Sequence, residues 1–98
     1  MDIESICLKM IANSGEGRSL AFEALRKAKA GDIEEAKKKL KGADDLLTEA
    51  HKAQTSLLNE YCKGENVQVN VLLVHAQDHF MTSLLAKDLI YELIDLMK

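Results

Sequence analysis

Proline is absent from this chain, and glycine occurs at only five of its 98 positions. Proline breaks helices because it lacks a backbone N–H and its ring clashes with the preceding turn. Without it, long segments can form uninterrupted helices. Gly31 and Gly64 lie between such segments, where glycine suits a helix end or a loop.

Cysteine is scarce as well. Cys7 and Cys62 are the only two in the sequence, and they match none of the Cys-x-x-Cys spacings of zinc or redox sites. Both fall inside helical patterns, so we expect buried free thiols in a reducing cytosol. A disulfide between them stays open at this point.

The chain has neither an excess of positive charge nor a cluster of aromatic side chains. Its net charge is −3 at pH 7, which disfavours binding to nucleic acid. The basic run Lys37–Lys41 has acidic neighbours on both sides and is typical of a solvated helix face. The two phenylalanines and two tyrosines are too scattered to stack on bases.

No apolar run approaches the roughly 18 residues that a membrane-spanning helix requires. The first residues, Met1–Glu4, are acidic and no long apolar segment follows them, so we expect no secretory signal. These features predict a cytoplasmic protein without direct membrane insertion, and the length predicts a single domain over residues 1–98.

The first expected helix runs from about Ile3 to Ala30. Gly15 and Gly17 disfavour helix in its middle, so we expect a kink or break near Ser14. Apolar and small residues step alternately by four and three and define one packing face: Ile3, Cys7, Met10, Ser14, Gly17, Ala21, Ala24 and Ala28.

The second expected helix begins after Asp32, which is placed as an N-cap with Glu35 three residues later to complete a capping box. Its packing face follows a strict three–four repeat with one polar member: Ile33, Ala36, Leu40, Ala43, Leu47, Ala50, Gln54, Leu57 and Tyr61. A loop is expected over Lys63–Asn66.

The third expected helix runs from about Val69 to Met97. Its start is ambiguous, because the valines between Val67 and Val74 alternate partly with polar residues, as in a strand. A single strand would have no partner, so we favour helix. The result is an antiparallel three-helix bundle with helices about 40 Å long. Apolar residues on more than one face of the third helix suggest self-association.

The third helix contains the run His75-Ala76-Gln77-Asp78-His79. His75, Asp78 and His79 fall at i, i+3 and i+4, with Thr82 following at i+7, so one helical face would present all four. Imidazoles and a carboxylate are costly to bury unless they are paired, metal-bound or functional. A satisfied polar layer or a solvent-facing stripe explains the pattern equally well on spacing alone.

Two chemical interpretations of this run are open. A neutral imidazole at His75 is a nucleophile, and Asp78, His79 or the Gln77 carbonyl could fix its tautomer. Alternatively, the run supplies up to three zinc ligands, which His51 and Gln54 could complete if the bundle brought them near. His51 is equally suited to a plain helix surface. Arg18, beside two glycines, could contact an anion.

The run Val74–Ser83 resembles the signature of the lactose/cellobiose-type IIA component of the bacterial sugar phosphotransferase system. Three further segments, Asn13–Ser19, Glu49–Thr55 and Leu84–Ile90, fit the same family. The resemblance covers nearly the whole chain. Phe80 stands where the family usually has leucine, a difference that should not affect the chemistry.

The resemblance implies a three-helix protein that assembles as a homotrimer. It implies that His75 accepts a phosphoryl group from phospho-HPr and passes it to a cysteine of the IIB partner, for a sugar that enters through the IIC permease. Asp78 would meet its two symmetry mates around one divalent cation, Mg²⁺, on the trimer axis. His79 and Gln77 would have supporting roles.

The resemblance does not name the sugar. Ala76, in place of glycine, favours cellobiose or chitobiose over lactose. The alternatives from other classes are a non-catalytic helical adaptor or metal-binding scaffold, and a zinc enzyme, which would need stoichiometric zinc with an open coordination position.

Overall fold

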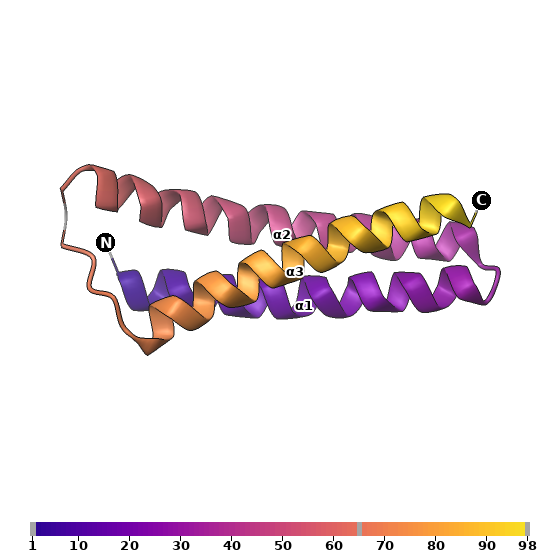
Figure 1. Cartoon of the computed structure of the whole chain (residues 1–98), viewed down its shortest axis with the longest axis horizontal. Coiled ribbons are helices and arrows are strands. Elements are labelled where there is room, and N and C mark those ends of the chain that lie inside the picture. The colour runs from indigo at the N-terminus through magenta and orange to yellow at the C-terminus, as the bar shows by residue number, and fades with distance from the viewer. Residues whose placement is uncertain (1, 65, 98) are drawn as a thin grey trace.

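Three long helices form the whole of the regular structure in the computed structural model, which describes residues 2–64 and 66–97. Helix α1 spans Ile3–Lys29, α2 spans Ile33–Cys62 and α3 spans Val71–Leu96. Helices α1 and α3 point the same way and α2 runs against both (Figure 1). The bundle is rod-shaped, with extents of 49 × 20 × 16 Å. The antiparallel three-helix prediction is therefore confirmed.

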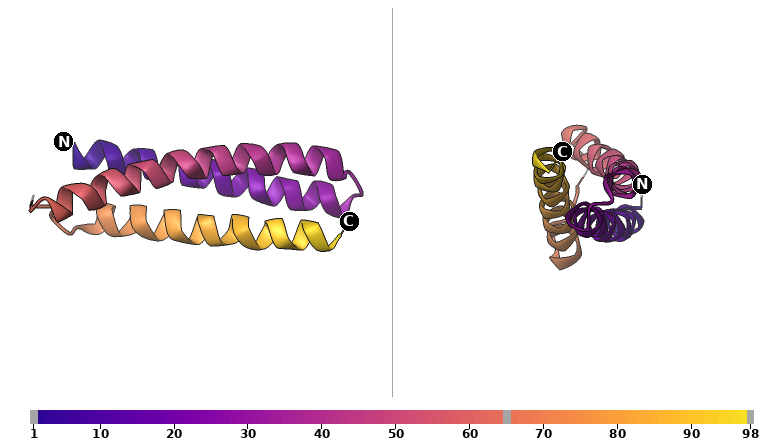
Figure 2. Two further views of the ribbon diagram at one scale, coloured as in Figure 1. Left: turned by 90° about the horizontal axis from the view of Figure 1, so that it is seen from above. Right: turned by 90° about the vertical axis from the view of Figure 1, so that its right-hand side faces the viewer.

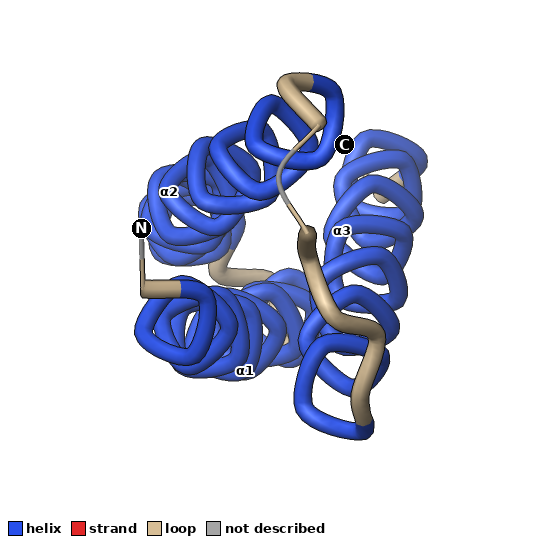
Figure 3. The backbone as a smooth tube through the Cα atoms, turned by 90° about the vertical axis from the view of Figure 1, so that its left-hand side faces the viewer, coloured by secondary structure: helices blue, strands red, loops and turns tan. Residues whose placement is uncertain are grey.

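Helix α1 makes most of the contacts between the helices of the bundle. It packs along both other helices, whereas α2 and α3 touch each other much less. Seen end-on, the three helices occupy the corners of a triangle, with α3 inclined to the other two (Figures 2 and 3). The inclination lets α2 and α3 diverge, because two straight rods that cross can stay in contact over only part of their length.

Side-chain caps define where the helices begin. The carboxylates of Asp2 and Asp32 accept hydrogen bonds from the backbone N–H groups three residues on, at Ser5 (3.2 Å) and Glu35 (3.1 Å). These bonds satisfy donors that the first helical turn leaves free. Gly31 follows α1 with a φ of 89°, a left-handed conformation that glycine adopts at little cost. The predicted end of α1 and start of α2 are thus confirmed.

The start of α3 lies two residues later than predicted. The side chain of Asn70 accepts a hydrogen bond from the Leu73 N–H (2.9 Å) and caps the helix. Residues 66–70 form an irregular link, and Val67 packs against the core from this link. The strand-like alternation therefore reflects an extended connection with one inward valine, and the described residues contain no strand.

The buried face of α1 matches the predicted one, apart from the half-buried Ile3. The kink or break predicted near Ser14 does not interrupt the helix, because α1 is continuous from Ile3 to Lys29. Gly17 is used for close approach: a Cβ there would lie 3.0 Å from Leu47 Cγ and 3.3 Å from the Ala43 carbonyl oxygen of α2. This close packing offsets the helix propensity that glycine lacks, about 1 kcal/mol relative to alanine.

The predicted face of α2 is buried from Ala36 to Ala50 and again at Leu57. Between them Ala53 is buried instead of Gln54, and beyond them Tyr61 is exposed. A straight helix has 3.6 residues per turn, so over 30 residues its buried face drifts away from a strict heptad repeat. The C-terminal end of α2 also extends beyond the start of α1 (Figure 1).

The outer face of α3 is apolar and uncovered. Val74, Met81, Leu85 and Leu89 are each more than half exposed. Their spacing places them on one stripe, away from the buried residues of the same helix. A stripe of this kind is the feature on which the predicted self-association depends.

The two cysteines differ in environment. Both thiols are free, as expected, but only Cys7 is buried. The prediction of burial is wrong for Cys62, which lies at the exposed C-terminal end of α2. In the described part of the chain, none of the helices has the length and hydrophobicity needed to cross a membrane.

Candidate functional site

The motif residues of α3 divide between two neighbouring surfaces. His75 and Asp78 are exposed, and His79 is partly buried. His79 lies toward α1, because its Nε2 atom approaches the backbone of Gly15. Asp78 shares the apolar outer stripe of α3 with Val74 and Met81, which lie four residues before it and three after it. The predicted polar face is therefore real, and it extends from the α1 side of α3 to the outer stripe.

His75 and His79 form a stacked pair. Their ring centroids are 5.5 Å apart and the ring planes differ by 11°. Burial lowers the pKa of His79, and the nearby positive charges of Arg18 and His75 lower it further, against the opposing effect of Asp78. The neutral form of His79 is thus favoured, next to the exposed imidazole of His75.

Thr82 closes the polar face at its C-terminal end. Its hydroxyl donates to the backbone carbonyl of Asp78 at 2.8 Å. This bond to the preceding turn uses the one donor proton of the hydroxyl, although the oxygen can still accept. Thr82 therefore contributes to the local structure of α3.

Gln77 lies on the α2 side of α3. Its side-chain carbonyl accepts a hydrogen bond from the Gln54 amide at 2.8 Å, and the same amide nitrogen lies 3.6 Å from the Met81 sulfur. This pair links α2 to α3 across the bundle. The structure thus brings Gln77 to Gln54 rather than to His75.

His51 is apart from the other two histidines. Its ring packs edge-on against Phe80, with centroids 5.8 Å apart and an interplanar angle of 76°. Phe80 is fully buried. Within residues 2–64 and 66–97, no group of three or more His, Cys, Asp or Glu side chains could hold a metal ion. The zinc site considered from the sequence, with His51 as a ligand, is not assembled within this described part of the chain.

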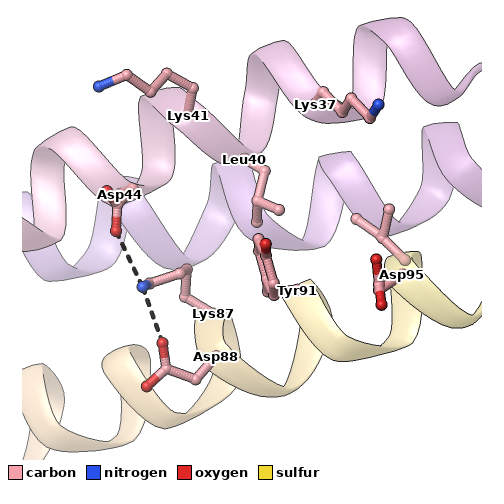
Figure 4. Close-up of a pocket in the computed structure, with 9 residues that line it drawn as sticks. Lys37, Leu40, Lys41, Asp44, Lys87, Asp88, Tyr91 and Asp95 are labelled. Carbon is pink, nitrogen blue, oxygen red and sulfur yellow. Dashed lines mark ion pairs between the residues drawn. The ribbon is translucent and has the colours of Figure 1, made fainter.

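A groove of about 520 Å³ opens between α2 and α3, toward the C-terminal end of α3. Leu40 and Ile94 supply apolar lining, and Lys87 points between two carboxylates (Figure 4). Its Nζ atom lies 3.0 Å from Asp44 and 2.8 Å from Asp88. Partial burial alone would lower the pKa of Lys87, but the hydrogen bonds to Asp88 and Asp44 outweigh it and raise the pKa. No motif residue lines this groove.

The structure also shows two contacts that sequence reasoning missed. The first is the Gly15–His79 approach, and the second is the Lys87–Asp44 ion pair. Gly15 was conspicuous in the sequence as a helix-disfavouring residue, and that was the only signal for the first contact. Nothing in the local sequence pairs Lys87 with a carboxylate on another helix.

Comparison with known proteins agrees with this geometry. The family model described as "PTS system, Lactose/Cellobiose specific IIA subunit" matches residues 5–98. A lichenan-specific phosphotransferase enzyme IIA component from Bacillus subtilis is 44% identical over 95 residues, which cover 97% of this chain and 86% of the relative. A lactose-specific EIIA component from Streptococcus mutans is 44% identical over 90 residues, or 92% of this chain and 86% of the relative.

A solved structure has the same fold. In a IIA(Chitobiose)–HPr complex, the matching chain is 42% identical to this one and superimposes with a TM-score of 0.84, over 99% of this chain and 94% of the other. The match of sequence and structure thus extends over nearly the full length of both. This chain belongs to the lactose/cellobiose-specific IIA subunit family of the phosphotransferase system.

Proposed function

We propose that His75 carries a phosphoryl group from phospho-HPr to a cysteine of the IIB partner, during uptake of a disaccharide through the IIC permease. As a IIA component the chain is a phosphocarrier, not the adaptor or scaffold considered from the sequence alone. The observation that carries the assignment is that His75 is the exposed imidazole of the α3 signature run, whereas its neighbour His79 is partly buried against α1. His51 is exposed as well, but it lies on α2, outside that run, with its ring edge-on to Phe80.

The transfer consists of two displacements at phosphorus. A nitrogen of His75 attacks the phosphoryl group of phospho-HPr, forming a new N–P bond as the bond to the HPr histidine breaks. The thiolate of the IIB cysteine then attacks, forming an S–P bond as the N–P bond breaks. Such transfers depend mainly on in-line positioning and charge stabilisation, and the stacked His79 ring supports the orientation of His75.

Both partners must reach the same nitrogen, so we propose that HPr and IIB use overlapping surfaces around His75. Transient interfaces of this kind fall at the small end of the size range. The HPr assignment is supported by the similar chain that was solved in a IIA(Chitobiose)–HPr complex. Because the chain would exchange phosphoryl groups with these partners, we propose that it is cytoplasmic.

The phosphorylation test uses the general phosphotransferase components with phosphoenolpyruvate. The wild type should acquire an acid-labile, base-stable phosphate. His75→Ala should keep its helical content and accept none. Label found on His79 or His51 of the wild type would overturn the assignment.

His79 is proposed to support the transfer without carrying the group. His79→Gln removes the stacked ring and should slow phosphorylation while leaving a measurable rate. If His79→Gln were as inactive as His75→Ala, with its fold intact by circular dichroism, the role of His79 would be larger than proposed.

We propose cellobiose or chitobiose as the transported sugar rather than lactose. Ala76 supports this branch, and because Ala76 is fully buried it is a marker of the branch and not a sugar contact. The test measures phosphoryl transfer to each sugar in membranes that contain the cognate IIB and IIC proteins. Transfer to lactose at the higher rate would contradict the proposal.

We propose a homotrimer whose axis runs along the outer stripe of α3, with Asp78 of each copy around one Mg²⁺ ion. Asp78 fits this role because it is an exposed carboxylate between the apolar side chains of Val74 and Met81. Each chain would contribute a single carboxylate, so the site would exist only in the assembly. Three such carboxylates repel one another, and a hard cation with oxygen ligands would neutralise them.

Sedimentation of wild type and Asp78→Leu, with and without a chelator, tests this assembly. Chelation should weaken the wild-type trimer, because the three carboxylates would then repel one another without a neutralising cation. Asp78→Leu should associate at least as strongly and ignore the chelator. If the wild type ignores the chelator and Asp78→Leu dissociates into monomers, Asp78 acts through hydrogen bonds and the metal assignment is wrong.

A further inference from the structure

Gly15 lies in the interior of α1, and the helix passes through it without a break. Interior glycine is unfavourable in a helix because it loses more backbone entropy than alanine. The backbone of Gly15 does not need a positive φ, since only Gly31 and Gly64 have one among the described glycines. Backbone conformation therefore does not require glycine at position 15. The reason for the glycine must lie in the side chains that surround it.

The space beside Gly15 is filled by the ring of His79. A Cβ atom built on Gly15 would lie 3.1 Å from His79 Nε2 and 4.0 Å from His79 Cε1. The first distance is shorter than ordinary van der Waals contact. Any side chain at position 15 would therefore displace the His79 ring by a few tenths of an ångström.

The displacement would reach His75, because the two imidazoles are stacked. The Gly15 backbone lies beside the Nε2–Cε1 edge of the His79 ring, and that ring is stacked with the ring of His75. His75 itself is exposed, so protein packing constrains its ring on few sides. Among the described residues, the ring of His79 is the one aromatic ring in contact with that of His75.

We propose that Gly15 is a positioning residue for phosphoryl transfer. Its missing side chain lets His79 lie against α1, and the His79 ring then sets the orientation of His75. This inference rests on the proposed role of His75. It assigns a function to a residue of α1, far from the motif in sequence, that touches neither the phosphoryl group nor a partner.

The first test is Gly15→Ala, with Gly42→Ala as a matched control. Both substitutions favour helix, and a Cβ at Gly42 would meet only the flexible end of Leu20, at 3.2 Å from Cδ1. Both variants should keep their fold and melt at or above the wild-type temperature, because alanine favours helix. Gly15→Ala should slow phosphoryl transfer from phospho-HPr by about three- to tenfold, since small misplacements of a reacting group reduce rate steeply. Gly42→Ala should transfer at the wild-type rate.

A double variant separates this route from any other effect of Gly15. In a His79→Ala background the added Cβ has no ring to displace, so Gly15→Ala should cause no further loss of rate. An equal loss in both backgrounds, or no loss in either, would overturn the proposal. If Gly15→Ala alone does not fold, recovery of the fold in the double variant supports the contact, and failure to recover it contradicts the proposal.

Proton NMR of the unphosphorylated protein detects the stacking of the His75 and His79 rings directly. Gly15→Ala should change the ring-current shifts of the His75 imidazole protons and weaken their cross-peaks to His79, while Gly42→Ala leaves both unchanged. Unaltered His75 signals in Gly15→Ala would overturn the proposal. This measurement needs no phosphate, so it still tests whether Gly15 sets the His79–His75 ring geometry if the label is found on another residue and the assignment of His75 fails.

Discussion

Removing the hydroxyl of Ser83 should make this protein more stable. Ser83 and Ser14 are both fully buried, and their hydroxyl oxygens have no hydrogen-bond partner among the described residues. A buried polar group without a partner costs about 1–3 kcal/mol. Alanine also has a better helix propensity than serine, by about 0.5 kcal/mol. Ser83→Ala should therefore increase the free energy of unfolding by about 1.5–3.5 kcal/mol.

The matched control is Ser19→Ala, because Ser19 is an exposed serine inside α1. It should show only the propensity gain of about 0.5 kcal/mol. Denaturant unfolding at one fixed protein concentration gives both values, since association makes stability depend on concentration. For a domain of this size, 1 kcal/mol corresponds to about 4–8 °C in melting temperature. A Ser83→Ala gain no larger than that of Ser19→Ala would refute the cost assigned to the buried hydroxyl.

Three further predictions concern stability and accessibility. Phe80→Ala should lower the free energy of unfolding by about 3–5 kcal/mol in denaturant titrations, because Phe80 is the largest fully buried side chain; a loss under 1 kcal/mol would contradict its place in the core. Asn70→Ala should cost about 0.5–2 kcal/mol through loss of the α3 cap, whereas Asn70→Asp should not. Cys62 should react with a thiol reagent at once and Cys7 only as the chain opens, because burial shields the Cys7 thiol and raises its pKa; equal rates in the folded protein would show that Cys7 is not buried.

Local features of the sequence predicted most of the helical framework. Helical periodicity specifies the packing face of α1 from Cys7 to Ala28, and local capping specifies the helix boundaries at Gly31 and Asp32. The same locality explains the errors. Asn70 is as good an N-cap as Asp32, but the valines around it suggested an earlier start. Gly15 suggested a break because its helix propensity is visible in the sequence while its neighbours in space are not.

The motif residues were also recognisable from the sequence, because spacing along one helix places His75 beside His79 before any tertiary structure is known. Only the tertiary structure could show that His75 is exposed whereas His79 is partly buried. That outcome depends on how α1 and α3 cross, and the crossing brings Gly15 against His79. The Gln54–Gln77 hydrogen bond depends in the same way on the approach of α2 to α3. Contacts within a helix follow from periodicity, whereas contacts between helices follow from the packing of whole faces, which no short stretch of sequence specifies.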